Sequence, residues 1–252
     1  MHLVAYIAKR LLQLIPILIG VSMVTFVTAR MLPGSPAVMA AGPLASQEQI
    51  AQLAEQMGLD RPLWEQYVRY VGNILRGDFG TSWRSGQPVT HELMRRFPAT
   101  FELITLAMIL AVLIGVPLGA LAAVRQGSKL DHTVRVFSVA GVSIPVFWSG
   151  LMLMFVFYYL LQWAPAPVGR IGFRVSPPTH ITGMYVLDSI LTLNGKALAS
   201  SLSQMALPLT TLVFAMLSPI VRITRSSMLE TLREDYVRTA RASGLSGRTI
   251  IF

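Results

Sequence analysis

Side chains that could take part in chemistry are few in this 252-residue chain, and they stand far apart. The chain contains no cysteine, which excludes disulfides and thiol chemistry. Its histidines are scattered singly, without the Cys or His spacing of a metal site; they are His2, His91, His132 and His180. No Ser/His/Asp or metal constellation stands out either. We therefore expect no metal site, no cofactor and no enzymatic activity of the chain itself.

Two short segments combine glycine with lysine, as phosphate-binding loops do. Gly127-Ser128-Lys129 and Gly195-Lys196-Ala197 nevertheless lack the flanking glycine and the Ser or Thr of such a loop. We therefore expect any ATP hydrolysis that serves this protein to take place on another polypeptide.

The composition is that of a protein whose main solvent is lipid. Hydrophobic residues make up 53% of the chain and charged residues only 13%, against about 25% charged residues in soluble domains. The mean hydropathy is +0.57. The net charge of +9 could indicate nucleic-acid binding, so the placement of the charges has to decide.

Apolar stretches long enough to cross a membrane, about 20 residues, recur along the chain. We predict four spans: Leu11–Ala29, Leu103–Val124, Val134–Trp163 and Met205–Val221. The first is longer than the apolar region of a signal peptide, so we interpret it as an uncleaved span. The third exceeds one perpendicular crossing and should be tilted or end in the interface. The stretch Met184–Leu193 is short and contains Asp188, which places it at the interface.

Basic residues cluster beside the predicted spans rather than across one surface. An even number of spans separates the three clusters, so all three can lie on the cytoplasmic side. They are Lys9 and Arg10; Arg125, Lys129 and Arg135; and Arg222, Arg225, Arg233, Arg238, Arg241 and Arg248. The positive charge is then a sign of topology, with a cytoplasmic N-terminus, and nucleic-acid binding is not expected.

The long loop after the first span is predicted to be external and helical. Ser46 and Gln49 have the spacing of a capping box, and Gly58 suits the end of the helix that follows. A second helix is expected from Pro62 to Gly77. The amphipathic stripes of both helices favour a structural cap over direct contact with a solute.

A short helix is also predicted after the fourth span. Glu234 and Asp235 open it, Arg238 and Arg241 follow near its end, and Gly244 can adopt the left-handed conformation that stops it. Its small residues suit insertion into a groove of a partner. The residues alone favour an ordinary amphipathic cytoplasmic turn over such a docking helix.

This segment resembles the Glu-Ala-Ala loop of binding-protein-dependent ABC permeases, the helix that docks on the ATP-binding subunit. Ala240 and Gly244 match the general pattern, and the sequence from Tyr236 to Leu245 is similar to that of the oligopeptide/dipeptide/nickel subfamily. The resemblance implies an ATPase-docking site formed by Tyr236, Arg238, Thr239, Ala240, Arg241, Ala242, Ser243 and Gly244.

Further stretches resemble the same subfamily, in the same order and across essentially the whole chain. They are Leu32–Ala37, Gly77–Ser82, Pro98–Leu103, Gly115–Ala123, Ser143–Trp148 and Pro167–Arg170. Ser35 stands where the subfamily usually has an aspartate.

The resemblance implies an all-α polytopic membrane helical bundle, the fold of a type I ABC importer permease, with four of an expected six spans. We expect a chain truncated within or just after the coupling loop. The implied organisation is an N-terminal transmembrane helix (1–30), an extracytoplasmic helical loop (31–98) and a transmembrane permease domain (99–252).

The implied setting is the bacterial inner membrane, in contact with lipid, and the implied solutes are peptides or related compounds such as nickel chelates. The implied partners are a homologous second permease, two ATP-binding subunits and an extracytoplasmic solute-binding protein. A stand-alone secondary carrier or channel is the alternative, but the spans contain almost no ionisable residues for proton relay.

Within the spans, small residues and prolines carry the remaining signals. Gly115, Gly119 and Ala123 are expected to let a neighbouring helix approach closely. Kinks are permitted at Pro117, Pro145, Pro208 and Pro219. Glu102, near the start of the second span, is expected to complement the dipole of its own helix rather than to serve transport.

Overall fold

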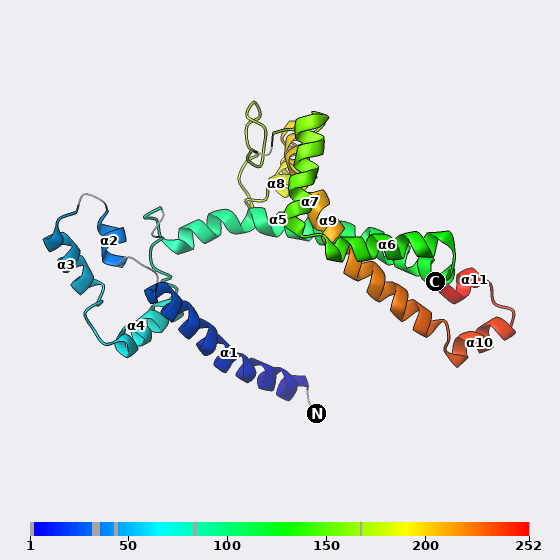
Figure 1. Cartoon of the computed structure of the whole chain (residues 1–252), viewed down its shortest axis with the longest axis horizontal. Coiled ribbons are helices and arrows are strands. Elements are labelled where there is room, and N and C mark those ends of the chain that lie inside the picture. Colours follow the sequence, from blue (N-terminus) through cyan, green and yellow to red (C-terminus); the bar gives the residue numbers. More distant parts are fainter. Residues whose placement is uncertain (1–2, 32–35, 43–44, 83–84, 167, 252) are drawn as a thin grey trace. The chain divides into compact units, whose positions relative to one another are not determined.

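The computed structural model describes residues 3–31, 36–42, 45–82, 85–166 and 168–251. Every regular element in these residues is helical, apart from one isolated antiparallel bridge between Thr81 and Pro88 (Figure 1). The predicted all-α class is confirmed. Residues Leu32–Ser35, which carry part of the resemblance, lie outside the described residues, as does Pro167.

The chain forms two compact units, Met1–Arg95 and Arg96–Phe252. The first contains α1 (Leu3–Met31), α2 (Pro36–Ala41), α3 (Gln47–Gln56) and α4 (Leu63–Leu75). The second contains most of α5 (Val89–Val124) and all later elements. These are α6 (Lys129–Ser143), α7 (Val146–Leu153), the π-helix η1 (Met154–Leu160), α8 (Tyr185–Leu191), α9 (Gly195–Thr231), α10 (Asp235–Ala242) and α11 (Gly247–Ile251).

In the first unit, α1 presents an almost fully exposed apolar surface, and α4 touches it through polar and aromatic side chains. Ser22 Oγ and the Tyr67 hydroxyl share a hydrogen bond of 2.8 Å. The ring of Phe26 meets the ring of Tyr67 edge-on, with centroids 5.5 Å apart. These contacts tie the predicted external helix α4 to the first span.

The loop helices α3 and α4 begin and end as their sequences predict. The Ser46 hydroxyl accepts a hydrogen bond from the Gln49 N–H at 3.2 Å, and the Gln49 side chain accepts one from the Ser46 N–H at 2.9 Å. The capping box is therefore confirmed. Gly58, after α3, and Gly77, after α4, have φ angles of +66° and +81°, which glycine adopts without steric cost.

In the second unit, α9 is the element on which the others assemble. The helices α6, α7 and α8 all pack against it, and α8 lies beside its first turns (Figure 1). Three helices of the described chain, α1, α5 and α9, are each long and apolar enough to cross a membrane. The bent pair of α6 with α7 and η1 makes a fourth if it counts as one span.

The third predicted span, Val134–Trp163, is not one continuous helix. It divides into α6 and the α7–η1 segment, which are bent by 103° relative to each other. The break lies at Ile144, whose ψ of 123° is extended. Pro145 explains this, because its ring disfavours helical geometry in the preceding residue and it has no N–H to continue the helix. By contrast, Pro117, Pro208 and Pro219 lie inside helices that continue past them.

The helices extend beyond the apolar stretches that predicted them. The fourth span was predicted as Met205–Val221, whereas α9 runs from Gly195 to Thr231. Hydropathy marks the lipid-facing residues only, while helical hydrogen bonds continue through polar residues up to a cap. The cap here is Asn194, whose side chain accepts a hydrogen bond from the Ala197 N–H at 3.1 Å.

The glycines of α5 lie directly against α9. A Cβ atom on Gly115 would stand 2.9 Å from Ile220 Cγ2, and one on Gly119 would stand 2.8 Å from the Val221 carbonyl oxygen. Ala123, one turn further along, is 3% exposed. At Gly115 and Gly119, the backbones of α5 and α9 approach more closely than any larger side chain would allow. Such close approach is how helices gain contact in lipid, where there is no hydrophobic drive between them.

Candidate functional site

The helix α10 follows α9 after a three-residue turn and exposes most of its surface. Asp235 lies in its first turn and Arg241 in its last, an arrangement that complements the helix dipole. Val237 is buried, 4% exposed, and anchors one face, whereas the neighbouring Tyr236 is 63% exposed. The anchored helix therefore presents its opposite face to solvent.

The end of α10 depends on glycine for its backbone conformation alone. Gly244 has a φ of +79°, and a Cβ atom there would meet nothing within 4 Å. Its N–H donates to the Arg241 carbonyl at 3.0 Å, and the Leu245 N–H donates to the Ala240 carbonyl at 3.3 Å. These bonds close the helix with a left-handed residue, as the sequence predicted.

The structure brings all eight predicted docking residues together on α10 and its closing turn. Seven of them are exposed and the eighth, Ala240, is partly so. Arg238 bonds Asp235 at 3.2 Å along the helix surface. Because Ala242 and Ser243 are small and exposed, a partner surface could approach the helix backbone closely near the end of α10.

A buried ion pair joins α9 to the start of α6, on the side of the unit that leads into α10. Asp131, 1% exposed, accepts hydrogen bonds from Arg225 Nε at 2.6 Å and Arg225 Nη2 at 3.0 Å. It also accepts one from the Gly127 N–H at 3.0 Å. One carboxylate thus holds the α5–α6 turn, α6 and α9 together.

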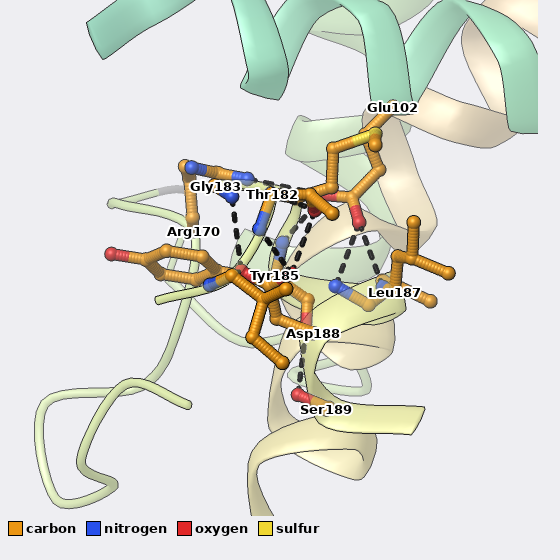
Figure 2. A network of polar contacts seen from close by, with 11 residues as sticks. Glu102, Arg170, Thr182, Gly183, Tyr185, Leu187, Asp188 and Ser189 are labelled. Atoms are coloured by element: carbon orange, nitrogen blue, oxygen red, sulfur yellow. Dashed lines mark hydrogen bonds and ion pairs between the residues drawn. The ribbon is translucent and has the colours of Figure 1, made fainter. Parts of the chain in front are cut away.

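Toward the opposite end of α9, Glu102 of α5 caps the N-terminus of α8 (Figure 2). This carboxylate is 4% exposed. It accepts hydrogen bonds from the backbone N–H groups of Tyr185, Val186 and Leu187 at 3.1, 2.7 and 3.2 Å. Three free N–H groups and the positive end of a helix dipole are the usual setting for an anion.

The sequence-based interpretation of Glu102 was wrong about which helix it serves. We expected it to complement the dipole of its own helix, but α5 begins at Val89, so Glu102 lies well inside it. Its counter-charges come instead from α8 and from Arg170, whose Nη2 lies 3.1 Å from the carboxylate. Arg170 also stacks over the Tyr185 ring, 3.9 Å from its centroid.

Asp188 of α8 organises the segment in front of that helix (Figure 2). It is 1% exposed and accepts bonds from the Thr182 hydroxyl at 2.7 Å and from the N–H groups of Ile181, Thr182 and Gly183. Burial raises its pKa, but these hydrogen bonds outweigh burial and hold the pKa below its ordinary value. The Asp188 carboxylate therefore contributes its full stabilisation at pH values above the unfolded pKa of about 3.9. This stabilisation is lost as the pH falls through the lower pKa of the folded state.

An apolar cavity of about 460 Å³ lies between α7, α9 and the segment that follows η1. Its lining includes Leu103, Phe147, Gly150, Pro165, Gln204 and Thr211. Gln204 Oε1 is buried and has no hydrogen-bond partner among the described residues. The cavity is thus mainly apolar, and the polar side chains of its lining are Ser203, Gln204 and Thr211.

Family comparison assigns both parts of the chain to one kind of protein. Residues 115–252 match the family described as the binding-protein-dependent transport system inner membrane component. Residues 3–104 match the N-terminal region of binding-protein-dependent transport system membrane components. The chain belongs to this family. It is a multi-pass protein of the bacterial inner membrane.

Relatives of this permease family are similar over almost the whole chain. A probable D,D-dipeptide transport system permease of Escherichia coli (strain K12) is 46% identical over 243 residues, which are 96% of this chain and 71% of that protein. The dipeptide transport system permease of the same strain is 41% identical over 250 residues, 98% and 73% of the two chains. A di/tripeptide permease of Pseudomonas aeruginosa (strain UCBPP-PA14) is 40% identical over 253 residues, 99% and 74%.

Replacing Glu102 by glutamine should destabilise the permease strongly. The amide nitrogen would face backbone N–H donors, with which it cannot form hydrogen bonds. The substitution would also leave Arg170 without its counter-charge, and removing one partner of a buried ion pair costs about 3–5 kcal/mol. We expect the unfolding temperature in detergent to fall by roughly 6 °C or more. The control is Glu230→Gln, the same change at an exposed position of α9. Equal unfolding temperatures for the two variants would contradict the assigned role of Glu102.

Proposed function

We propose that this chain is a permease subunit of an ATP-driven importer and forms part of the membrane pathway for dipeptides or other short peptides. The similarity to dipeptide and di/tripeptide permeases over almost the entire chain carries this proposal. A nickel chelate is the related solute that the subfamily also includes. The partners we propose are a homologous second permease, two ATP-binding subunits and an extracytoplasmic solute-binding protein.

We further propose that α10 is the element that docks on an ATP-binding subunit. Three features support this role: the helix is short, most of its surface is exposed, and small residues stand near its end. It is also connected directly to α9, the helix on which the second unit assembles. A displacement of α10 by a partner would therefore act on α9, the helix against which α6, α7 and α8 pack.

Proton-coupled transport by the chain alone finds no support in the buried carboxylates. Among the described residues these are Glu102, Asp131 and Asp188, and each one is held by an arginine or by several hydrogen-bond donors. A proton relay needs carboxylates that change protonation at working pH. Carboxylates whose oxygens are already engaged by several donors suit structural roles instead.

The proposed orientation places the N-terminus and α10 in the cytoplasm and the α3–α4 region outside. Single cysteines test it cleanly, because the natural chain has none. In intact cells, an impermeant thiol reagent should label a cysteine at the exposed Gln52 of α3 and should not label one at Ser246, after α10. Labelling at Ser246 from outside would reverse the proposed topology.

The docking role of α10 predicts specific defects in the assembled importer. Gly244→Val forces a β-branched side chain into a left-handed conformation, at a cost of roughly 1–2 kcal/mol. Ala240→Trp adds bulk where close contact is proposed. Both variants should insert normally, because neither residue lies in a span, yet both should lower solute-stimulated ATP hydrolysis and uptake together.

Gly247→Val is the matched control for the glycine substitution. Gly247 has open space around it and no left-handed φ, so it should tolerate valine. If α10 had no partner, the changes at Gly244 and Ala240 would cost local stability only and would leave uptake and solute-stimulated ATP hydrolysis per assembled complex unchanged. Normal uptake with both Gly244→Val and Ala240→Trp would therefore remove α10 as the docking element.

A further inference from the structure

We propose that the Asp131–Arg225 ion pair is the joint through which movement of α10 reaches α6 and the α6–α7 bend, so that ATP hydrolysis and solute transport remain coupled. This inference rests on the proposed function, because α10 is the segment proposed to contact the ATP-binding subunit. Both residues act through other groups and are positioning residues rather than parts of a solute site.

The position of the pair carries the first part of the inference. Arg225 lies in the last turns of α9, about 9 Å along the helix from its end at Thr231. Its guanidinium holds Asp131 through two hydrogen bonds, and Asp131 in turn holds the Gly127 N–H. A displacement of α10 that moves the end of α9 therefore acts directly on the start of α6.

The chemistry of the pair suits a joint better than it suits added stability. Taking two charges out of water is costly, and apolar residues of similar volume often stabilise such a site as well or better. A two-point bond between a planar guanidinium and a carboxylate fixes both distance and angle, which apolar contact does not. The other cation beside Asp131 is Arg135, 3.8 Å away and 54% exposed, so it contributes little to this constraint.

The connection continues along α6 to the bend. Near the end of α6, Gly141 lies so close to α9 that an added Cβ atom would overlap Ser218 Oγ. The helix then stops at Ile144, and α7 leaves at 103° after Pro145. The first residues of α7, Val146 and Phe147, line the apolar cavity. The ion pair therefore stands on the continuous packed path from the proposed docking helix to the wall of the cavity.

The test uses the assembled importer in proteoliposomes and measures ATP hydrolysis and uptake of a labelled dipeptide per assembled complex. In the double variant Asp131→Leu/Arg225→Met the site stays filled but loses its directional bonds. We expect assembly and ATP hydrolysis to persist while uptake per ATP falls by roughly fivefold or more, as in loss of a coupling between sites. The control Arg135→Gln removes the exposed cation only and should leave uptake per ATP unchanged.

A purely structural pair would change the amount of assembled complex but not uptake per ATP. Unchanged uptake per ATP in the double variant, or an equal loss in Arg135→Gln, would overturn the inference. If the double variant fails to assemble, Arg225→Lys decides instead, since it keeps the charge and loses the two-point geometry. Its uptake per ATP should fall, and a normal value would overturn the inference. A wild-type importer without ATP-dependent uptake would contradict the proposed function itself.

Discussion

The second unit depends on how closely α9 approaches the helices around it. In lipid there is no hydrophobic drive between helices, so contact must come from backbone proximity and polar bonds. Gly119 of α5 and Gly141 of α6 supply the proximity, because a Cβ atom at either position would meet atoms of α9. With α9 fixed in this way, α7 and α8 can pack on its remaining surface.

Two buried carboxylates then hold the helices of the second unit together at two separate places. Glu102 fastens α8 and Arg170 to α5, and Asp131 fastens Arg225 of α9 to the start of α6. Glu102 accepts three backbone N–H bonds and Asp131 accepts one, each in addition to a guanidinium, and buried charge is tolerated when it is paired and hydrogen-bonded in this way. Leu103, the residue after Glu102, lines the apolar cavity, and α6, which begins beside Asp131, leads to the α6–α7 bend.

The sequence was sufficient wherever a structure depends on neighbours along the chain. The capping box at Ser46 and Gln49, the helix from Asp235 and the left-handed Gly244 all follow from local hydrogen bonding, and the structure contains each of them. The resemblance also identified the family from the sequence, because the matching short segments occur along most of the chain. Spans were found from hydropathy, but their ends were not, because helices continue past the lipid until a cap stops them.

What the sequence could not supply depends on residues far apart in the chain. Glu102 meets α8 more than 80 residues later, and Asp131 meets Arg225 94 residues later. A lone acidic residue in an apolar stretch signals that a partner exists without identifying it. The break at Pro145 was permitted by its sequence but not required, since Pro117 and Pro208 remain inside continuous helices.

Dipeptide uptake into proteoliposomes tests the central claim most directly, namely that this chain moves peptides with energy from ATP hydrolysed on another subunit. The complete importer, with its second permease, ATP-binding subunits and solute-binding protein, should accumulate a labelled dipeptide only when ATP is present on the side of α10. Omitting the ATP-binding subunits should abolish that uptake. Uptake by this chain alone, driven by a solute or proton gradient without ATP, would contradict the account.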